Sequence, residues 1–126
     1  MTVAKKHILV VDDEPLLVRL HKRQLENDGY SVSVTTTSLD ALDLVTKNPG
    51  KYNLLLTDLT MPGLSGRELI QKILLQVTTL PVIVLTGMID SEIEKELYEL
   101  GVKAVLEKPL LDDELAKAVD RVLRVD

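Results

Sequence analysis

The sequence predicts an α/β protein in which a parallel sheet carries helices on both faces. Five short apolar segments alternate along the chain with five segments of helical periodicity, and this alternation is typical of right-handed βαβ units. Several apolar segments are nearly continuous in Val, Ile and Leu, as in strands buried on both faces. The length of 126 residues suits one domain with one core, so we expect a single domain over residues 1–126.

Composition indicates a folded domain, since 45% of the residues are hydrophobic and 28% are charged. A net charge of −5 argues against direct binding to nucleic acid or to an anionic membrane. The chain has no cysteine, which excludes disulfides and thiolate chemistry. No apolar run approaches the roughly 20 residues of a membrane span, and the first residues lack the apolar segment of a signal peptide. We therefore expect a cytoplasmic protein without membrane attachment.

The first strand is expected at residues 7–11, where an apolar run stops at Asp12 and Asp13. A helix follows from Pro15, because proline suits a first helical turn and a preceding aspartate can cap its free N–H groups. Gly29 is expected just after the C-cap of that helix. The inward face of the helix is expected to carry Leu16, Leu17, Leu20 and Leu25.

The segment 30–35 alternates between apolar and polar residues and predicts a strand near an edge of the sheet. Ser38 is the expected N-cap of a second helix, and the segment 48–50, Asn-Pro-Gly, ends it. The inward residues of this helix are expected to be Leu39, Leu42 and Val45.

The third and fourth strands are expected at 52–57 and 81–85, each followed by a helix that begins with a capping box, over 65–68 and 91–94. The last strand is expected at 103–106. The inward residues of the third helix are expected to be Ile70, Ile73, Leu74 and Val77. Those of the fourth helix are expected to be Ile93, Leu97 and Leu100. The final helix is expected to have Asp112 as its N-cap and Leu115, Ala118, Val119 and Val122 on its inward face.

Polar residues follow four of the predicted strands where each strand ends. They are Asp12 and Asp13, then Asp58, Thr86 and Lys108. The carboxyl ends of parallel strands share one edge of a sheet, which is where ligands bind in such folds. Three carboxylates on one edge repel each other, so their ionised state requires a cation. Oxygen ligands of this kind suit Mg²⁺.

A carboxylate beside Mg²⁺ can attack phosphorus and form an aspartyl-phosphate. Such a reaction needs positive charge on the phosphoryl oxygens and a donor that orients them. Lys108 and the Thr86 hydroxyl suit these two roles. Each residue alone has a simpler interpretation, as a helix cap, a strand-end residue or a surface cation. Together they indicate a phosphoryl-transfer site.

With these residues the sequence resembles the receiver domain of bacterial-type two-component response regulators. The resemblance covers about residues 7–123, and its motifs occur in order at predicted strand ends. They are Val10-Val11-Asp12-Asp13-Glu14-Pro15, Asp58 with Met61-Pro62-Gly63, Thr86-Gly87 and Lys108-Pro109. The resemblance implies a flavodoxin-like, doubly wound (βα)5 fold with strand order 2-1-3-4-5. It also implies a cis bond before Pro109.

The resemblance implies a role for each residue of the site. Asp58 would accept a phosphoryl group from a histidine kinase or a histidine phosphotransfer protein. Lys108 would contact the phosphoryl oxygens, and Thr86 would turn inward to bind them. Mg²⁺, for which Mn²⁺ can substitute, would be held by Asp12, Asp13, Asp58 and the backbone carbonyl of Thr60.

One position departs from the family pattern. An aromatic residue or histidine often stands three residues before the lysine and changes rotamer with the threonine, whereas this chain has Val105. Valine has one stiff χ1 angle and no ring to relocate. We therefore expect the switch to run through Thr86 and the loop 87–90.

The leading hypothesis is a phosphorylation-dependent switch in a phosphorelay, which catalyses only its own phosphorylation and dephosphorylation and is not otherwise an enzyme. A haloacid-dehalogenase-type phosphatase fits poorly, because Thr60 stands where that family has its second aspartate. A phosphorylation-independent interaction module is the alternative, although such proteins usually lose residues that are present here. The acidic fourth helix, the fifth strand and the basic last helix could form a homodimer or bind a downstream partner. The sequence does not decide between a stand-alone protein and a domain of a larger regulator.

Overall fold

The computed structural model describes residues 5–61, 63, 65–111 and 113–124. These residues form a parallel sheet of five strands in the order β2-β1-β3-β4-β5. The strands are β1 (His7–Val11), β2 (Ser31–Thr35), β3 (Leu54–Asp58), β4 (Val82–Thr86) and β5 (Ala104–Glu107). The helices are α1 (Pro15–Asn27), α2 (Ser38–Lys47), α3 (Gly66–Gln76), α4 (Ser91–Leu100) and α5 (Glu114–Leu123). The predicted fold class and strand order are confirmed.

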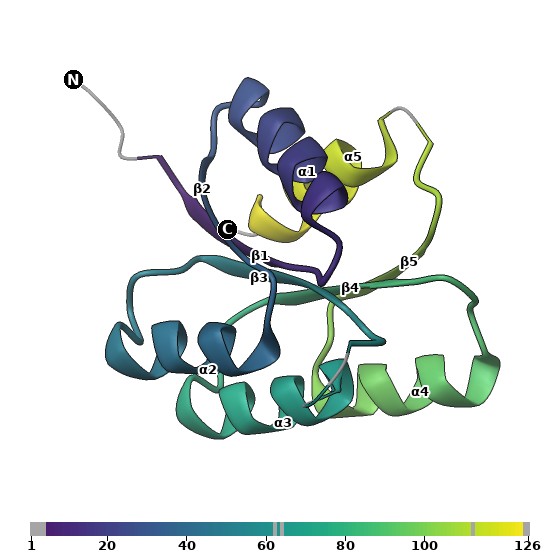
Figure 1. Cartoon of the computed structure of the whole chain (residues 1–126). Helices are drawn as coiled ribbons and strands as arrows, with labels where there is room; N and C mark the ends of the chain where they lie inside the picture. The colour runs from purple at the N-terminus through teal and green to yellow at the C-terminus, as the bar shows by residue number, and fades with distance from the viewer. Residues whose placement is uncertain (1–4, 62, 64, 112, 125–126) are drawn as a thin grey trace.

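The sheet forms the middle layer of the molecule. Helices α1 and α5 cover one face, and α2, α3 and α4 cover the other (Figure 1). All positions of the inner strands β3 and β4 are buried, as their continuous apolar sequences predicted. Alternate residues point to opposite faces, so Leu54 and Leu56 join the core under α1 and α5, whereas Leu55 joins the core under α2 to α4. In the described part of the chain, every helix falls short of the length and apolarity that a membrane span requires.

Two helix starts differ from the prediction by one residue. Thr37, not Ser38, is the N-cap of α2, and its hydroxyl accepts the N–H of Asp40 at 3.1 Å. Asp90, not Ser91, is the N-cap of α4, and its carboxylate accepts two N–H groups of the first turn. In both cases two good capping residues are adjacent, and residue type alone does not choose between them. The predicted cap Ser65 of α3 and the helix-ending Gly29 are confirmed. Pro62 and the predicted cap Asp112 lie outside the described residues.

The inward faces of the first two helices also differ from the prediction. Leu16 and Leu20 of α1 are 79% and 48% exposed, and Leu39 of α2 is 67% exposed. The buried residues of these helices are instead Val18, His21 and Leu25, and Ser38, Ala41 and Val45. Both sets follow the spacing of three and four residues that a helix face requires. The prediction was wrong because it counted leucines, whereas the buried faces include histidine, serine and alanine.

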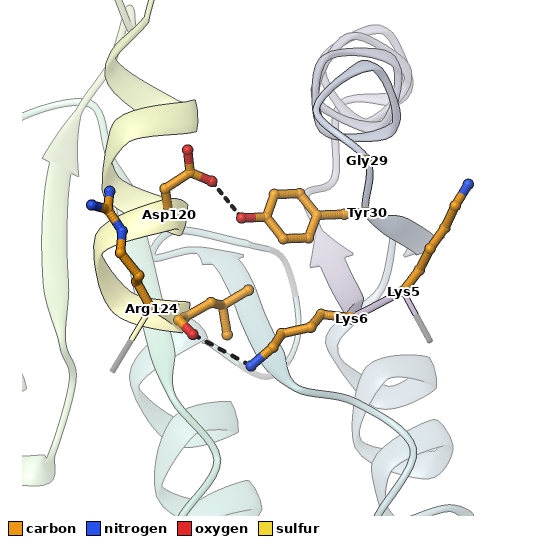
Figure 2. Close-up of a pocket in the computed structure, with 7 residues that line it drawn as sticks. Lys5, Lys6, Gly29, Tyr30, Asp120 and Arg124 are labelled. Carbon is orange, nitrogen blue, oxygen red and sulfur yellow. Dashed lines mark hydrogen bonds between the residues drawn. The ribbon is translucent and has the colours of Figure 1, made fainter. Parts of the chain in front are cut away.

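Helix α5 is joined to the start of the sheet by polar contacts at the edge opposite the strand carboxyl ends. The hydroxyl of Tyr30 donates a hydrogen bond to Asp120, and the Lys6 ammonium donates one to the carbonyl of Leu123 at 3.3 Å (Figure 2). These residues border a cavity of about 530 Å³. Burial and the hydrogen bond to Asp120 raise the pKa of Tyr30 from 10.0 to about 12.

Because its pKa is raised in the folded protein, Tyr30 favours folding while its phenol is neutral. This contribution is complete below pH 10 and is lost as the pH rises through about 12. We therefore expect an ultraviolet titration of tyrosine ionisation to contain one component near pH 12, which Tyr30→Phe removes and Tyr98→Phe, at an exposed position of α4, retains. A component that persists in Tyr30→Phe would contradict the assignment.

Candidate functional site

Four predicted site residues meet at the carboxyl edge of the sheet. Asp12 follows β1, Asp58 ends β3, Thr86 ends β4, and Lys108 follows β5. The Nζ atom of Lys108 lies 3.0 Å from Oδ2 of Asp12 and 3.1 Å from Oδ2 of Asp58. The ammonium therefore binds two carboxylates that come from neighbouring strands.

Both carboxylates are nearly inaccessible to solvent, since Asp12 is 1% and Asp58 is 6% exposed. Burial raises the pKa of Asp58; the ion pair with Lys108 and the N–H of Thr60 oppose this shift, and the charge of Asp12 adds to it. For Lys108 burial lowers the pKa, but the two carboxylates outweigh burial and raise it. The two carboxylates therefore favour the charged form of Lys108. Asp58 shares this one cation with Asp12, so the ion pair does not fully offset the cost of burying its ionised carboxylate.

Asp13 completes an acidic cluster. Among the described residues, Asp12, Asp13 and Asp58 each place a carboxylate oxygen so that the three atoms lie within 4.8 Å of one another. Asp13 is exposed, so this cluster opens to solvent on one side. Carboxylate oxygens at this spacing, with excess negative charge beside the Lys108 ammonium and access for water, fit the preferences of Mg²⁺.

Asp12 also takes part in the start of α1. Its Oδ1 accepts the N–H of Glu14 at 3.0 Å, while its Oδ2 binds Lys108. The expected capping of α1 by a preceding aspartate is wrong: the N-cap is Glu14, which makes no side-chain cap hydrogen bond, and Asp12 accepts the N–H of this N-cap residue and not one of the first turn. The hydrogen bond orients the side chain toward the acidic cluster.

Thr86 lies at the site, but its hydroxyl is bonded to its own loop. It donates to the carbonyl of Met88 at 3.1 Å and accepts the Met88 N–H at 3.4 Å. Thr60 reaches the site through its N–H, which contacts the Asp58 carboxylate. Val105 is 9% exposed within the core under α2 to α4. The bond between Lys108 and Pro109 is cis, as the resemblance implied.

The sequence did not reveal the role of Gly66, the first residue of α3. A Cβ atom at this position would lie 2.4 Å from the backbone oxygen of Asp58 and 2.7 Å from the Cα of Leu59. The N–H of Gly66 also donates to the carbonyl of Leu59 at 2.9 Å. The start of α3 therefore packs directly on the backbone that carries Asp58. A glycine just inside a predicted helix is a weak signal of such close approach.

Comparisons with known proteins agree with this fold and site. The profile of the response regulator receiver domain matches residues 8–120. The chain is 35% identical over 121 residues to the uncharacterized transcriptional regulatory protein YkoG of Bacillus subtilis, covering 95% of this chain and 52% of YkoG. It is 35% identical to the sensor histidine kinase RcsC of Salmonella typhi, covering 89% of this chain and 12% of RcsC. The non-phosphorylated HemR receiver domain from Leptospira biflexa superposes with a TM-score of 0.91 at 29% identity, covering 97% of both chains.

The chain belongs to the response regulator receiver domain family. Receiver domains are signalling domains of two-component systems and not classical enzymes. The chain spans about half the length of YkoG and a small part of RcsC, so such domains occur both in transcriptional regulators and in sensor kinases.

Replacing Gly66 with alanine should destabilise the domain. The new methyl group would force the backbone of Asp58 or Leu59 to move, and overpacking of this kind costs about 1–3 kcal/mol. We expect Gly66→Ala to lower the free energy of unfolding in urea by that amount. Gly50→Ala is the matched control, because a Cβ there meets no atom within 4 Å. Equal stability of the two variants would contradict the close packing.

Proposed function

We propose that this domain is a phosphorylation-dependent signalling switch in which Asp58 accepts the phosphoryl group. The supporting observation is the Lys108 ammonium, which contacts both Asp12 and Asp58 beside a third carboxylate, Asp13. This arrangement places a nucleophile, a cation and hard oxygen ligands within one small site. We propose that the donor is a phosphohistidine of a histidine kinase or histidine phosphotransfer protein.

In the proposed reaction an oxygen of Asp58 attacks the phosphorus atom. The bond between phosphorus and the donor histidine breaks, and the histidine leaves with a proton from solvent. Mg²⁺ bound by Asp12, Asp13, Asp58 and the carbonyl of Thr60 would supply charge neutralisation on the phosphoryl oxygens. The Lys108 ammonium, already 3.1 Å from Asp58, would contact the same oxygens from the protein side. Later attack by water on phosphorus returns the Asp58 carboxylate and releases phosphate.

We propose that Thr86 reports the phosphorylated state. Its hydroxyl would leave the Met88 carbonyl and donate to a phosphoryl oxygen on Asp58, which would move the loop 87–90 toward the site. A downstream partner or an output domain would sense this change on the face formed by α4, β5 and α5, where a second copy of the chain could also bind. We further propose that residues 1–126 form this single domain and act in the cytoplasm.

Incubation with acetyl phosphate tests the proposed acceptor. We expect an intact-mass spectrum to show a single phosphoryl adduct that requires Mg²⁺ or Mn²⁺ and disappears when the metal is chelated. Asp58→Asn should abolish the adduct, because an amide oxygen is a poor nucleophile, whereas Asp43→Asn on the exposed surface of α2 should retain it.

An adduct that persists in Asp58→Asn would disprove Asp58 as the acceptor. If wild type shows no adduct, a titration with beryllofluoride distinguishes rapid hydrolysis from an inability to react. Failure of both experiments would favour the interaction module that does not depend on phosphorylation.

The metal site makes a separate prediction. Mg²⁺ should raise the midpoint of thermal unfolding, because it binds the folded site and not the unfolded chain. Asp13→Asn removes one exposed carboxylate of the cluster and should weaken Mg²⁺ binding at least about tenfold in isothermal titration calorimetry. Asp43→Asn removes the same charge away from the cluster and should bind Mg²⁺ as wild type does. Equal Mg²⁺ affinity of the two variants would show that Asp13 is not a ligand.

A further inference from the structure

The loop between β4 and α4 (residues 87–90) is restrained by contacts at successive residues. The Thr86 hydroxyl exchanges hydrogen bonds with the backbone of Met88, donating at 3.1 Å and accepting at 3.4 Å. The N–H of the next residue, Ile89, donates to Oε2 of Glu107 at 3.3 Å. The two restraints act on neighbouring peptide groups, so a movement that breaks one affects the other.

Glu107 connects this loop to the acidic site. It is the last residue of β5 and the register partner of Thr86 in the sheet. The following residue is Lys108, whose N–H donates to the carbonyl of Thr86 at 2.7 Å and whose ammonium binds Asp58. Glu107 therefore links Lys108, its neighbour in sequence, to the loop 87–90, whose Ile89 N–H it accepts.

We infer that Glu107 is a positioning residue of the switch, which holds the loop 87–90 in the conformation where Thr86 binds Met88. The inference rests on the proposed function of Asp58 and Thr86. A threonine hydroxyl has one proton, so a Thr86 that donates to Met88 cannot donate to a phosphoryl oxygen. By fixing Ile89, Glu107 stabilises the conformation that Thr86 must leave.

The conformational change is expected in the loop 87–90 and not at Val105. Val105 is 9% exposed, is paired with Val84 and belongs to the core under α2 to α4. A buried β-branched side chain has one preferred rotamer and cannot carry a large rearrangement. The loop, in contrast, exposes 77% of Met88 and 38% of Ile89. The route from Thr86 to the surface therefore passes through the peptide groups that Glu107 restrains.

The test compares Glu107→Ala with Glu107→Gln in a beryllofluoride titration with Mg²⁺, followed by nuclear magnetic resonance. Glu107→Ala removes the acceptor of the Ile89 N–H, so we expect about two- to tenfold tighter binding than in wild type. Glu107→Gln loses the same charge but keeps an acceptor oxygen, so its affinity should stay close to that of wild type. Glu99→Ala on the exposed side of α4 controls for the change in net charge.

Two results would overturn the inference. Unchanged or weaker binding in Glu107→Ala would show that Glu107 does not oppose the switch. Equal tightening in Glu107→Gln and Glu107→Ala would show that the lost charge, and not the hydrogen bond, is responsible.

The coupling to Thr86 is tested by a double-mutant cycle. In a Thr86→Val background no hydroxyl has to leave Met88, so Glu107→Ala should lose most of its effect on affinity. An undiminished effect would show that Glu107 acts independently of Thr86.

The free protein separates this inference from the proposed function. In the absence of beryllofluoride, the Ile89 amide should exchange faster with deuterium and shift its resonance in Glu107→Ala but not in Glu99→Ala. If wild type fails to bind beryllofluoride, the proposed function fails, and the Ile89 amide still shows whether Glu107 holds the loop. An unchanged Ile89 amide in Glu107→Ala overturns the inference even if Asp58 is phosphorylated as proposed.

Discussion

Burial of two like charges around the Lys108 ammonium constrains the whole carboxyl edge of this sheet. Asp12 and Asp58 come from adjacent strands, about 5 Å apart, and both are almost completely buried. Lys108 comes from β5, two strand spacings from β3, and a lysine side chain is long enough to cross the end of β4. The strand order therefore places Lys108 within reach of both carboxylates. Removing one partner of a buried pair typically costs about 3–5 kcal/mol, so the site and the fold support each other.

The sequence predicts the strand order through its resemblance to a family, and it predicts the strand ends through physical chemistry. Asp12, Asp58, Thr86 and Lys108 each come at the end of an apolar run, and parallel strands align such ends. The sequence predicts the N-cap of α2 only to within one residue, because Thr37 and Ser38 are adjacent and either can accept an N–H. The prediction for the inward face of α1 was wrong because His21, a polar residue that is not expected in a core, takes a buried position. Gly66 and Glu107 were not identified, since their contacts depend on spatial neighbours and not on local pattern.

The site combines a part that is packed in the core with a loop that lies at the surface. Asp12 and Asp58 follow or end strands whose side chains are fully packed between two helix layers. Gly66 adds to this packing, because α3 contacts the Asp58 backbone without an intervening side chain. Thr86 leads instead into a short loop whose apolar side chains, Met88 and Ile89, are exposed. Under the proposed function, a phosphoryl group on Asp58 would therefore be held by packed strands and would lie next to a loop at the surface.

The cap of α4 would limit how far the proposed change at Thr86 extends. Asp90 accepts N–H groups from the first turn of α4, and Leu97 of the same helix is fully buried in the cluster that contains Val105. The movement proposed to start at Thr86 would thus meet a capped and packed helix after only a few residues. Met88 and Ile89, whose side chains are exposed, lie between Thr86 and the Asp90 cap. Under the proposed function, a local rearrangement of that loop, next to the acidic surface of α4, would change what a partner can contact without repacking the core.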